Sequence, residues 1–191
     1  MKIGIDVDGT ITDLQRFQID RGSKYLNKKV VNPNCMQLRN LFDVSSDVEL
    51  QFWDDVVFDY ASNYPVKTYV KEELDRMHDN GDEIYIITAR YHTYLQDDLG
   101  KQMRKTVREW FNKNDLYFDK FVFTKENKLQ RCKELGIDIM IEDKPANIKS
   151  IATYIPVIII DQVYNRHISG DNIYRAYSWA DVESIIKEIN N

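Results

Sequence analysis

Short runs of apolar, β-branched residues alternate with longer amphipathic segments along this chain, a pattern typical of an α/β protein. The apolar runs predict strands at about 2–7, 83–88, 120–123, 138–142 and 156–160. The amphipathic segments predict helices that start near Asp13 and Lys128, and others over about 67–79, 99–111 and 179–189. The run 156–160 is continuously apolar, as expected for a parallel strand buried on both faces. We therefore predict a three-layer α/β/α, Rossmann-like, doubly wound parallel sheet.

Residues 15–64 interrupt this regular alternation. They are rich in aromatic and Asn/Asp residues, and Pro33 with the preceding valines predicts short helices joined by turns. The regular pattern starts again at Pro65. We expect a core formed by 1–14 and 65–191, with residues 15–64 as a helical insertion after the first strand.

Composition narrows the classes of function. A chain of 191 residues with 43% hydrophobic content can build one α/β domain with a modest insertion. A net charge of −5 argues against a surface that coats a nucleic acid polymer, although a nucleotide monomer stays possible. Cys35 and Cys132 lie far apart and are expected to be reduced thiols. With no apolar run of membrane-spanning length, we expect a cytoplasmic protein with no membrane partner.

Two closely spaced candidate catalytic acids stand at the end of the first predicted strand. Its period of two puts Asp6 and Asp8 on the same face at its carboxyl end, and Gly9 lets the chain turn away sharply. The carboxyl edge of a parallel sheet is where open α/β folds bind ligands, and two adjacent carboxylates there need a divalent cation. The alternative is an acidic turn that caps the next element.

Three later segments weaken that alternative. The strand 83–88 ends in Thr88, whose hydroxyl and following amides can donate to a phosphate. Lys125 and Lys128 stand near a helix start, where the helix dipole already favours anions. The strand 138–142 leads into the adjacent acids Glu142 and Asp143.

Together these segments closely resemble the four motifs of the haloacid dehalogenase (HAD) superfamily of phosphohydrolases. They are DVDGT at 6–10, ITAR with Thr88, NKLQRC with Lys128, and IEDKPAN with Glu142 and Asp143, on a core of about three quarters of the chain. Within the superfamily, the FWDD segment, EIYIITAR, IDIMIEDKP and the terminal YNR and YSW are most similar to the 5′(3′)-deoxyribonucleotidases and their bacterial relatives. In that group the segment 15–64 corresponds to a small helical cap.

The resemblance implies roles for the four acidic residues. Asp6 is the nucleophile that forms an aspartyl-phosphate, and Asp8 is the general acid and then the base that activates water. Asp6, the backbone carbonyl of Asp8, and Asp143 bind Mg²⁺. Glu142 is expected outside the inner coordination shell, but the two adjacent acids can exchange this role. The alternative mechanism leaves Asp6 as a metal ligand only, with direct attack by water.

The other motif residues would bind the phosphate. Thr88 and the amides near Ala89 are expected to hold the phosphoryl oxygens, and Lys128 to balance the charge of the transition state. Lys125 competes for that role, but Lys128 begins the periodic helix and the resemblance aligns there.

Further substrate contacts are predicted around these motifs. Thr10 is expected to orient Asp8, and Arg90 to touch the substrate. Phe17, Phe52 and Trp53 are candidates to stack on the base from the cap, although aromatic residues at helical spacing are more often core. For the loop 164–166, no function follows from its residues.

We therefore expect a Mg²⁺-dependent phosphomonoester hydrolase, with a (deoxy)nucleoside monophosphate as the favoured substrate. One alternative is a HAD phosphatase of other small esters, such as sugar phosphates or flavin-type phosphates. A second, from another class, is a regulatory or scaffold protein on the same fold, which would be expected to lose Asp6, Asp8 or Lys128. The partner is a small phosphorylated metabolite, and the chain is a monomer or a homodimer.

Overall fold

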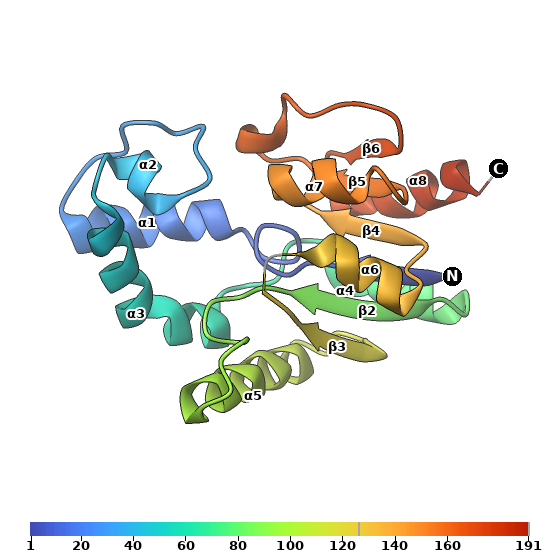
Figure 1. The fold of residues 1–191 in the computed structure, drawn as a ribbon, viewed down its shortest axis with the longest axis horizontal. Helices are drawn as coiled ribbons and strands as arrows, with labels where there is room; N and C mark the ends of the chain where they lie inside the picture. The colour runs from blue at the N-terminus through green and yellow to red at the C-terminus, as the bar shows by residue number, and fades with distance from the viewer. Residues whose placement is uncertain (126, 191) are drawn as a thin grey trace.

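A computed structural model describes residues 1–125 and 127–190 and contains a single six-stranded sheet. Its strands are parallel and lie in the order β3-β2-β1-β4-β5-β6 (Figure 1). The strands are β1 (Lys2–Ile5), β2 (Glu83–Thr88), β3 (Lys120–Phe123), β4 (Ile139–Glu142), β5 (Val157–Ile160) and β6 (Ile173–Ala176). The helices are α1 (Leu14–Leu26), α2 (Leu38–Phe42), α3 (Ser46–Asn63), α4 (Val70–Asp79), α5 (Asp98–Lys113), α6 (Lys128–Leu135), α7 (Pro145–Ile151) and α8 (Val182–Ile189), with short 3₁₀ helices η1 (Val163–Asn165) and η2 (Trp179–Asp181). No helix in the described ranges is long and apolar enough to cross a membrane.

Helices cover both faces of the sheet, which confirms the predicted three-layer α/β/α class. Side chains of α4, α5 and α8 form one buried cluster with alternate residues of the strands, such as Ile3, Ile5 and Ile86. Side chains of α6 and α7 form a second cluster with the opposite set, such as Ile87 and Met140. The period of two along each strand sends successive side chains to the two faces, so both faces are apolar and both are covered.

Helices α1, α2 and α3 stand beside the carboxyl edge of the sheet (Figure 1). They have a buried cluster of their own, to which Leu38, Phe42 and Val56 contribute. The C-terminal half of α3 also joins the main core through Val57 and Ala61. This arrangement agrees with a small helical insertion, and the boundaries 15–64 stay a prediction.

The structure contains two elements that the hydrophobic pattern did not predict. Strand β6 (IYRA) is a half-buried edge strand without the continuous apolar run that marks β5, and α7 has only seven residues, too few to show a clear helical period. The first strand also ends at Ile5 instead of residue 7. The backbone N–H of Asp6 still donates to the Ile141 carbonyl (3.0 Å), but the chain leaves the ladder after this bond.

Candidate active site

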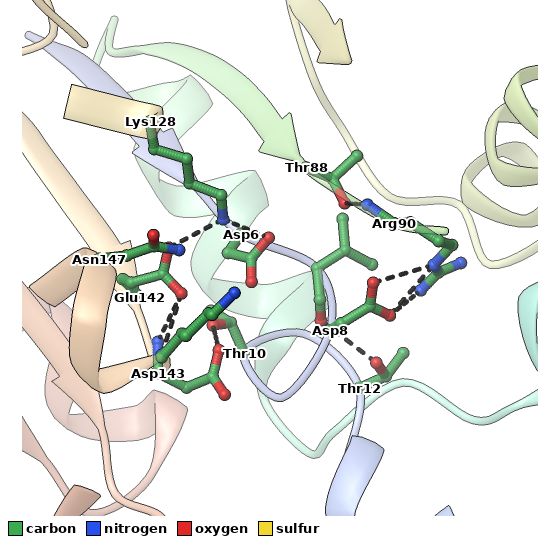
Figure 2. A network of polar contacts seen from close by, with 12 residues as sticks. Asp6, Asp8, Thr10, Thr12, Thr88, Arg90, Lys128, Glu142, Asp143 and Asn147 are labelled. Atoms are coloured by element: carbon green, nitrogen blue, oxygen red, sulfur yellow. Dashed lines mark hydrogen bonds and ion pairs between the residues drawn. The ribbon is translucent and has the colours of Figure 1, made fainter. Parts of the chain in front are cut away.

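The carboxyl ends of three neighbouring strands bring the predicted site residues together. Because β1 lies between β2 and β4, Asp6 after β1 is next to Thr88 at the end of β2 and Glu142 at the end of β4 (Figure 2). This edge borders a cavity of about 430 Å³. Asp6, Asp8 and Lys128 line the cavity from the core, and residues of α1 and α3 line it from the insertion.

Lys128 places a buried positive charge between two acids. Asn127 caps α6 by accepting a hydrogen bond from the Gln130 backbone N–H (3.2 Å), so Lys128 is the first helical residue. The Lys128 Nζ lies 2.6 Å from Asp6 Oδ1 and 2.8 Å from Glu142 Oε2 (Figure 2). Burial alone would lower the pKa of Lys128, but the charges of Asp6 and Glu142 outweigh burial and raise it. The amine therefore stays charged beside Asp6.

Both carboxylate oxygens of Glu142 accept hydrogen bonds. Its Oε1 accepts from the backbone N–H groups of Asp143 and Lys144, both at 3.1 Å. Its Oε2 accepts from Lys128 and from the Asn147 side-chain amide at 3.0 Å. Burial opposes ionisation, but the Lys128 charge and these bonds outweigh it, so the pKa of Glu142 is lowered. Four donors leave this carboxylate less available to a cation than its neighbour.

Asp143 is held from outside the sheet by the segment after β5. The Tyr164 hydroxyl donates to Asp143 Oδ2, and the Asn165 amide donates to the Asp143 backbone carbonyl (2.9 Å). Burial, followed by the charge of Glu142, raises the pKa of Asp143 to about 7. The sequence predicted no role for Tyr164 and Asn165; their position directly after the last predicted strand was the available signal.

Thr10 and Gly9 fit tightly against the same carboxylate. The prediction that Thr10 orients Asp8 is wrong, because the Thr10 hydroxyl donates to Asp143 Oδ1 (3.0 Å). Gly9 has a φ of 89°, and a Cβ at this position would lie 2.0 Å from Asp143 Oδ2. Only glycine fits this turn without displacing the carboxylate.

Arg90 binds Asp8 through both carboxylate oxygens. Arg90 Nε lies 3.0 and 3.1 Å from Asp8 Oδ1 and Oδ2, and Nη2 lies 2.5 Å from Oδ1 (Figure 2). The guanidinium carbon also lies 5.0 Å from the ring centroid of Tyr60, which belongs to α3. Arg90 lines the cavity, its main partner is Asp8, and its contact with a substrate stays a prediction. Because Asp8 is a predicted catalytic residue, its side-chain position depends on Arg90.

Thr88 and Ala89 lie at the carboxyl end of β2, and their binding of a phosphate stays a prediction. Thr88 is fully buried, and its Oγ1 accepts from the Arg90 backbone N–H (3.2 Å), while Ala89 lines the cavity. Lys125 lies elsewhere: its Nζ is 5.5 Å from the Tyr94 ring centroid, beside a separate cavity. Of the two candidate lysines, only Lys128 meets the carboxylates.

The three candidate stacking residues separate into two groups. Trp53 lines the cavity, whereas Phe17 and Phe52 do not. Phe52 is fully buried and Phe17 is 7% exposed, and both pack in the cluster of α1, α2 and α3. Stacking on a substrate from either phenylalanine would require this cluster to open, so the structure gives Phe17 and Phe52 a packing role.

The acidic residues fit a divalent cation. Asp6, Glu142 and Asp143 are buried, and each offers a carboxylate oxygen within 4.8 Å of the others. Burial raises the pKa of Asp6 well above its usual value, and the charges of Glu142, Asp143 and Asp8 add to this rise against the opposing effect of Lys128. If all three carboxylates were ionised, they would carry more negative charge than Lys128 neutralises, so a further cation would favour their ionised forms. Oxygen donors in such a cluster are the ligands that Mg²⁺ prefers.

The whole chain matches a known protein family. A family model described as 5′ nucleotidase, deoxy (pyrimidine), cytosolic type C protein matches residues 1–190. A nucleotidase of Clostridium acetobutylicum is 24% identical over 193 residues, covering 99% of this chain and 95% of its own. A Bacillus cereus protein described as "Putative nucleotidase" is 29% identical over 200 residues, covering 98% and 99%.

Solved structures share the fold. "A predicted phosphatase from Clostridium acetobutylicum" has a TM-score of 0.66 at 18% identity, covering 98% of each chain. A HAD-superfamily hydrolase from Ehrlichia chaffeensis has a TM-score of 0.58 at 13% identity, covering 100% of this chain and 97% of its own. At these identities the solved structures show only that the fold is shared. The match to the family model over residues 1–190 shows the family to which the chain belongs.

Proposed function

We propose that this chain, which belongs to the family of cytosolic type C 5′(deoxy)nucleotidases within the HAD superfamily, hydrolyses the phosphate ester of deoxynucleoside monophosphates. That it is a phosphatase follows from its family. The observation that carries the proposal is Asp6, which is buried, lines the cavity and lies 2.6 Å from Lys128. A carboxylate in this place can reach a phosphorus atom while the lysine neutralises the attacking and transferred oxygens.

The proposed reaction has two displacements at phosphorus. An Asp6 oxygen forms a bond to phosphorus while the bond to the leaving oxygen breaks. Asp8, after it takes up a proton and moves away from Arg90, gives that proton to the leaving oxygen. A water molecule then gives its proton to Asp8 and attacks the phosphorus, which releases phosphate and regenerates Asp6. Both acids line the cavity, so both can reach one substrate.

The groups that stabilise the transferred phosphoryl group belong to Thr88, Ala89 and Lys128. The Thr88 oxygen already accepts a hydrogen bond, so its own proton is available to a phosphoryl oxygen. The buried Lys128 charge acts at short range in a region with little water. Fixed donors of this kind need no reorganisation as negative charge develops.

We propose Mg²⁺ as the cation of the acidic cluster. Asp6, Asp143 and the Asp8 backbone carbonyl would hold it, and Asp143 is favoured over Glu142 because Glu142 already has four donors. When bound, the ion supplies positive charge to the phosphoryl oxygens and to the crowded carboxylates.

The insertion side of the cavity favours a neutral leaving group. The described residues that line it from α1 to α3 include apolar and amide side chains and one acid, Glu49, but no lysine, arginine or histidine. A nucleoside has an aromatic base and hydrogen-bonding edges that suit this wall. A second phosphate group would meet Glu49, which already pairs with Arg39 (3.7 Å), and no lysine, arginine or histidine among these lining residues, so this wall supports a nucleoside monophosphate over a sugar bisphosphate.

A substrate panel tests this proposal. Purified protein with Mg²⁺ should hydrolyse deoxynucleoside monophosphates with a kcat/KM at least about tenfold above that for sugar bisphosphates, since a factor of ten is about 1.4 kcal/mol of discrimination. Preference for a bisphosphate or a flavin-type phosphate would support the alternative of a HAD phosphatase with another substrate. Absence of hydrolysis across the panel would instead support a regulatory or scaffold protein.

Trp53→Ala should reduce recognition of the nucleoside. If the indole stacks on the base, kcat/KM for a deoxynucleoside monophosphate should fall roughly 5- to 150-fold relative to that for 4-nitrophenyl phosphate, since stacking contributes about 1–3 kcal/mol. Steady-state kinetics on both substrates measures this ratio.

Phe52→Leu is the control for Trp53→Ala. Phe52 is the sequence neighbour of Trp53 and is fully buried away from the cavity. Its substitution should lower thermal stability and leave the ratio between the two substrates unchanged. Equal losses on both substrates in Trp53→Ala would show that Trp53 only packs the insertion.

A further inference from the structure

Gln18 presents one fixed hydrogen-bond acceptor to the cavity. Gln18 lies on α1, is 2% exposed and lines the cavity on the insertion side. Its Nε2 donates to the Met36 carbonyl at 2.9 Å. If the amide were flipped, its oxygen would face the Met36 carbonyl oxygen, so this contact sets the orientation of the side chain.

The other end of this amide has no partner among residues 1–125 and 127–190. Gln18 Oε1 accepts no hydrogen bond from the described residues. Among these residues every buried side-chain oxygen and nitrogen atom has a partner, so Oε1 must reach open space. Since Gln18 is almost wholly buried and lines the cavity, that space is the cavity.

We propose that Gln18 is a specificity-determining residue that accepts a hydrogen bond from an N–H group on the nucleobase of the substrate. This inference rests on the proposed function. Helix α1 stands beside the carboxyl edge of the sheet (Figure 1). Because Gln18 lies on α1 and the proposed phosphate site lies at the sheet edge, Gln18 would meet the nucleoside end of a bound substrate. An acceptor that cannot rotate discriminates against a base that lacks the donor, because the oxygen then loses its water without a replacement bond.

Gln15 provides a matched control on the same helix. It lies three residues before Gln18, and its Nε2 donates to the carbonyls of Pro33 (3.0 Å) and Cys35 (2.8 Å). Both glutamines therefore support the segment before α2. Gln15 is not among the residues that line the cavity, so its substitution removes support for this segment without removing the acceptor.

The test compares thymidine 5′-monophosphate with its N3-methyl derivative, which lacks the base N–H, and with 2′,3′-dideoxythymidine 5′-monophosphate, which lacks the 3′-hydroxyl. The wild-type protein should prefer the unmethylated nucleotide by about 5- to 30-fold in kcat/KM. Gln18→Met should reduce this preference to within about twofold, while Gln15→Met should keep it. The preference over the dideoxy nucleotide should be the same in all three proteins.

Several results would overturn the inference. Equal rates of the wild-type protein on the methylated and unmethylated nucleotides would do so without any variant, even if Gln18→Met failed to fold. If Gln15→Met lost the preference for the unmethylated nucleotide as fully as Gln18→Met, the effect would belong to the segment before α2. If Gln18→Met lost only the preference over the dideoxy nucleotide, Gln18 would contact the sugar and not the base. Hydrolysis of 4-nitrophenyl phosphate but of no nucleotide would overturn the proposed function itself, and the base contact with it.

Discussion

Asp6→Asn should reduce kcat on the order of 10⁴-fold or more, since removal of a covalent nucleophile costs an enzyme about that much. An amide oxygen is a weak nucleophile, so asparagine at position 6 cannot replace the carboxylate in the attack on phosphorus. Glu142 is also near Lys128, but its oxygens are engaged by four donors. Steady-state rates on a nucleotide and on 4-nitrophenyl phosphate should fall together, because both need the same first step.

The variant should still fold. Asparagine matches aspartate in shape, and Lys128 keeps its ion pair with Glu142 (2.8 Å). Removal of one charge from the crowded acidic cluster also relieves repulsion, so the melting temperature should stay the same or rise. Activity near that of the wild-type protein in a folded Asp6→Asn variant would contradict the assignment of Asp6 as the nucleophile and favour direct attack by water.

Removal of divalent cations should abolish turnover. The reacting phosphate is itself negative, and it must approach Asp6 beside Glu142 and Asp143 with Lys128 as the nearest buried cation. Without further positive charge, repulsion among these groups opposes both substrate binding and attack. The assay uses metal-free protein, verified by elemental analysis, in excess chelator.

Added Mg²⁺ should restore the rate of hydrolysis. A sodium salt added to the same ionic strength should not restore it. Asp143→Asn should raise the Mg²⁺ concentration needed for half-maximal rate, because this carboxylate is proposed to bind the ion directly. Full activity in chelator after verified metal removal would exclude the metal assignment.

The sequence predicted the parts of the site that depend on strand ends and helix starts. Asp6, Thr88 and Glu142 follow apolar runs, and parallel strands place their carboxyl ends at one edge. Lys128 follows a capping asparagine, so the helix start itself points the lysine toward that edge. These features are local in sequence, so periodicity placed the residues at strand ends and at a helix start, and the resemblance to the HAD motifs supplied their expected roles.

The contacts that cross between elements could not be predicted in this way. The sequence predicted that Thr10 contacts Asp8, but in the structure it bonds to Asp143. This contact depends on the path of the turn at Gly9, which brings Thr10 to a residue 133 positions away. The pairing of Arg90 with Asp8 depends on how the loop after β2 folds over β1. Helical spacing placed Phe52 and Trp53 equally well for substrate contact, but only the packing of α1 against α3 shows which of the two is buried.

Direct capture of a covalent intermediate on Asp6 tests the central claim of this mechanism. The protein carrying Asp8→Asn is mixed with substrate and Mg²⁺ and then reduced with borohydride, which converts an aspartyl-phosphate to homoserine. With 4-nitrophenyl phosphate as the substrate, the leaving group departs without a proton from Asp8, so Asp8→Asn chiefly slows the attack of water and the intermediate should accumulate. Peptide mass spectrometry should then find homoserine at position 6, dependent on substrate and absent when Asp6→Asn is added. Homoserine at another position, or none at position 6 while the variant still turns over substrate, would contradict the mechanism.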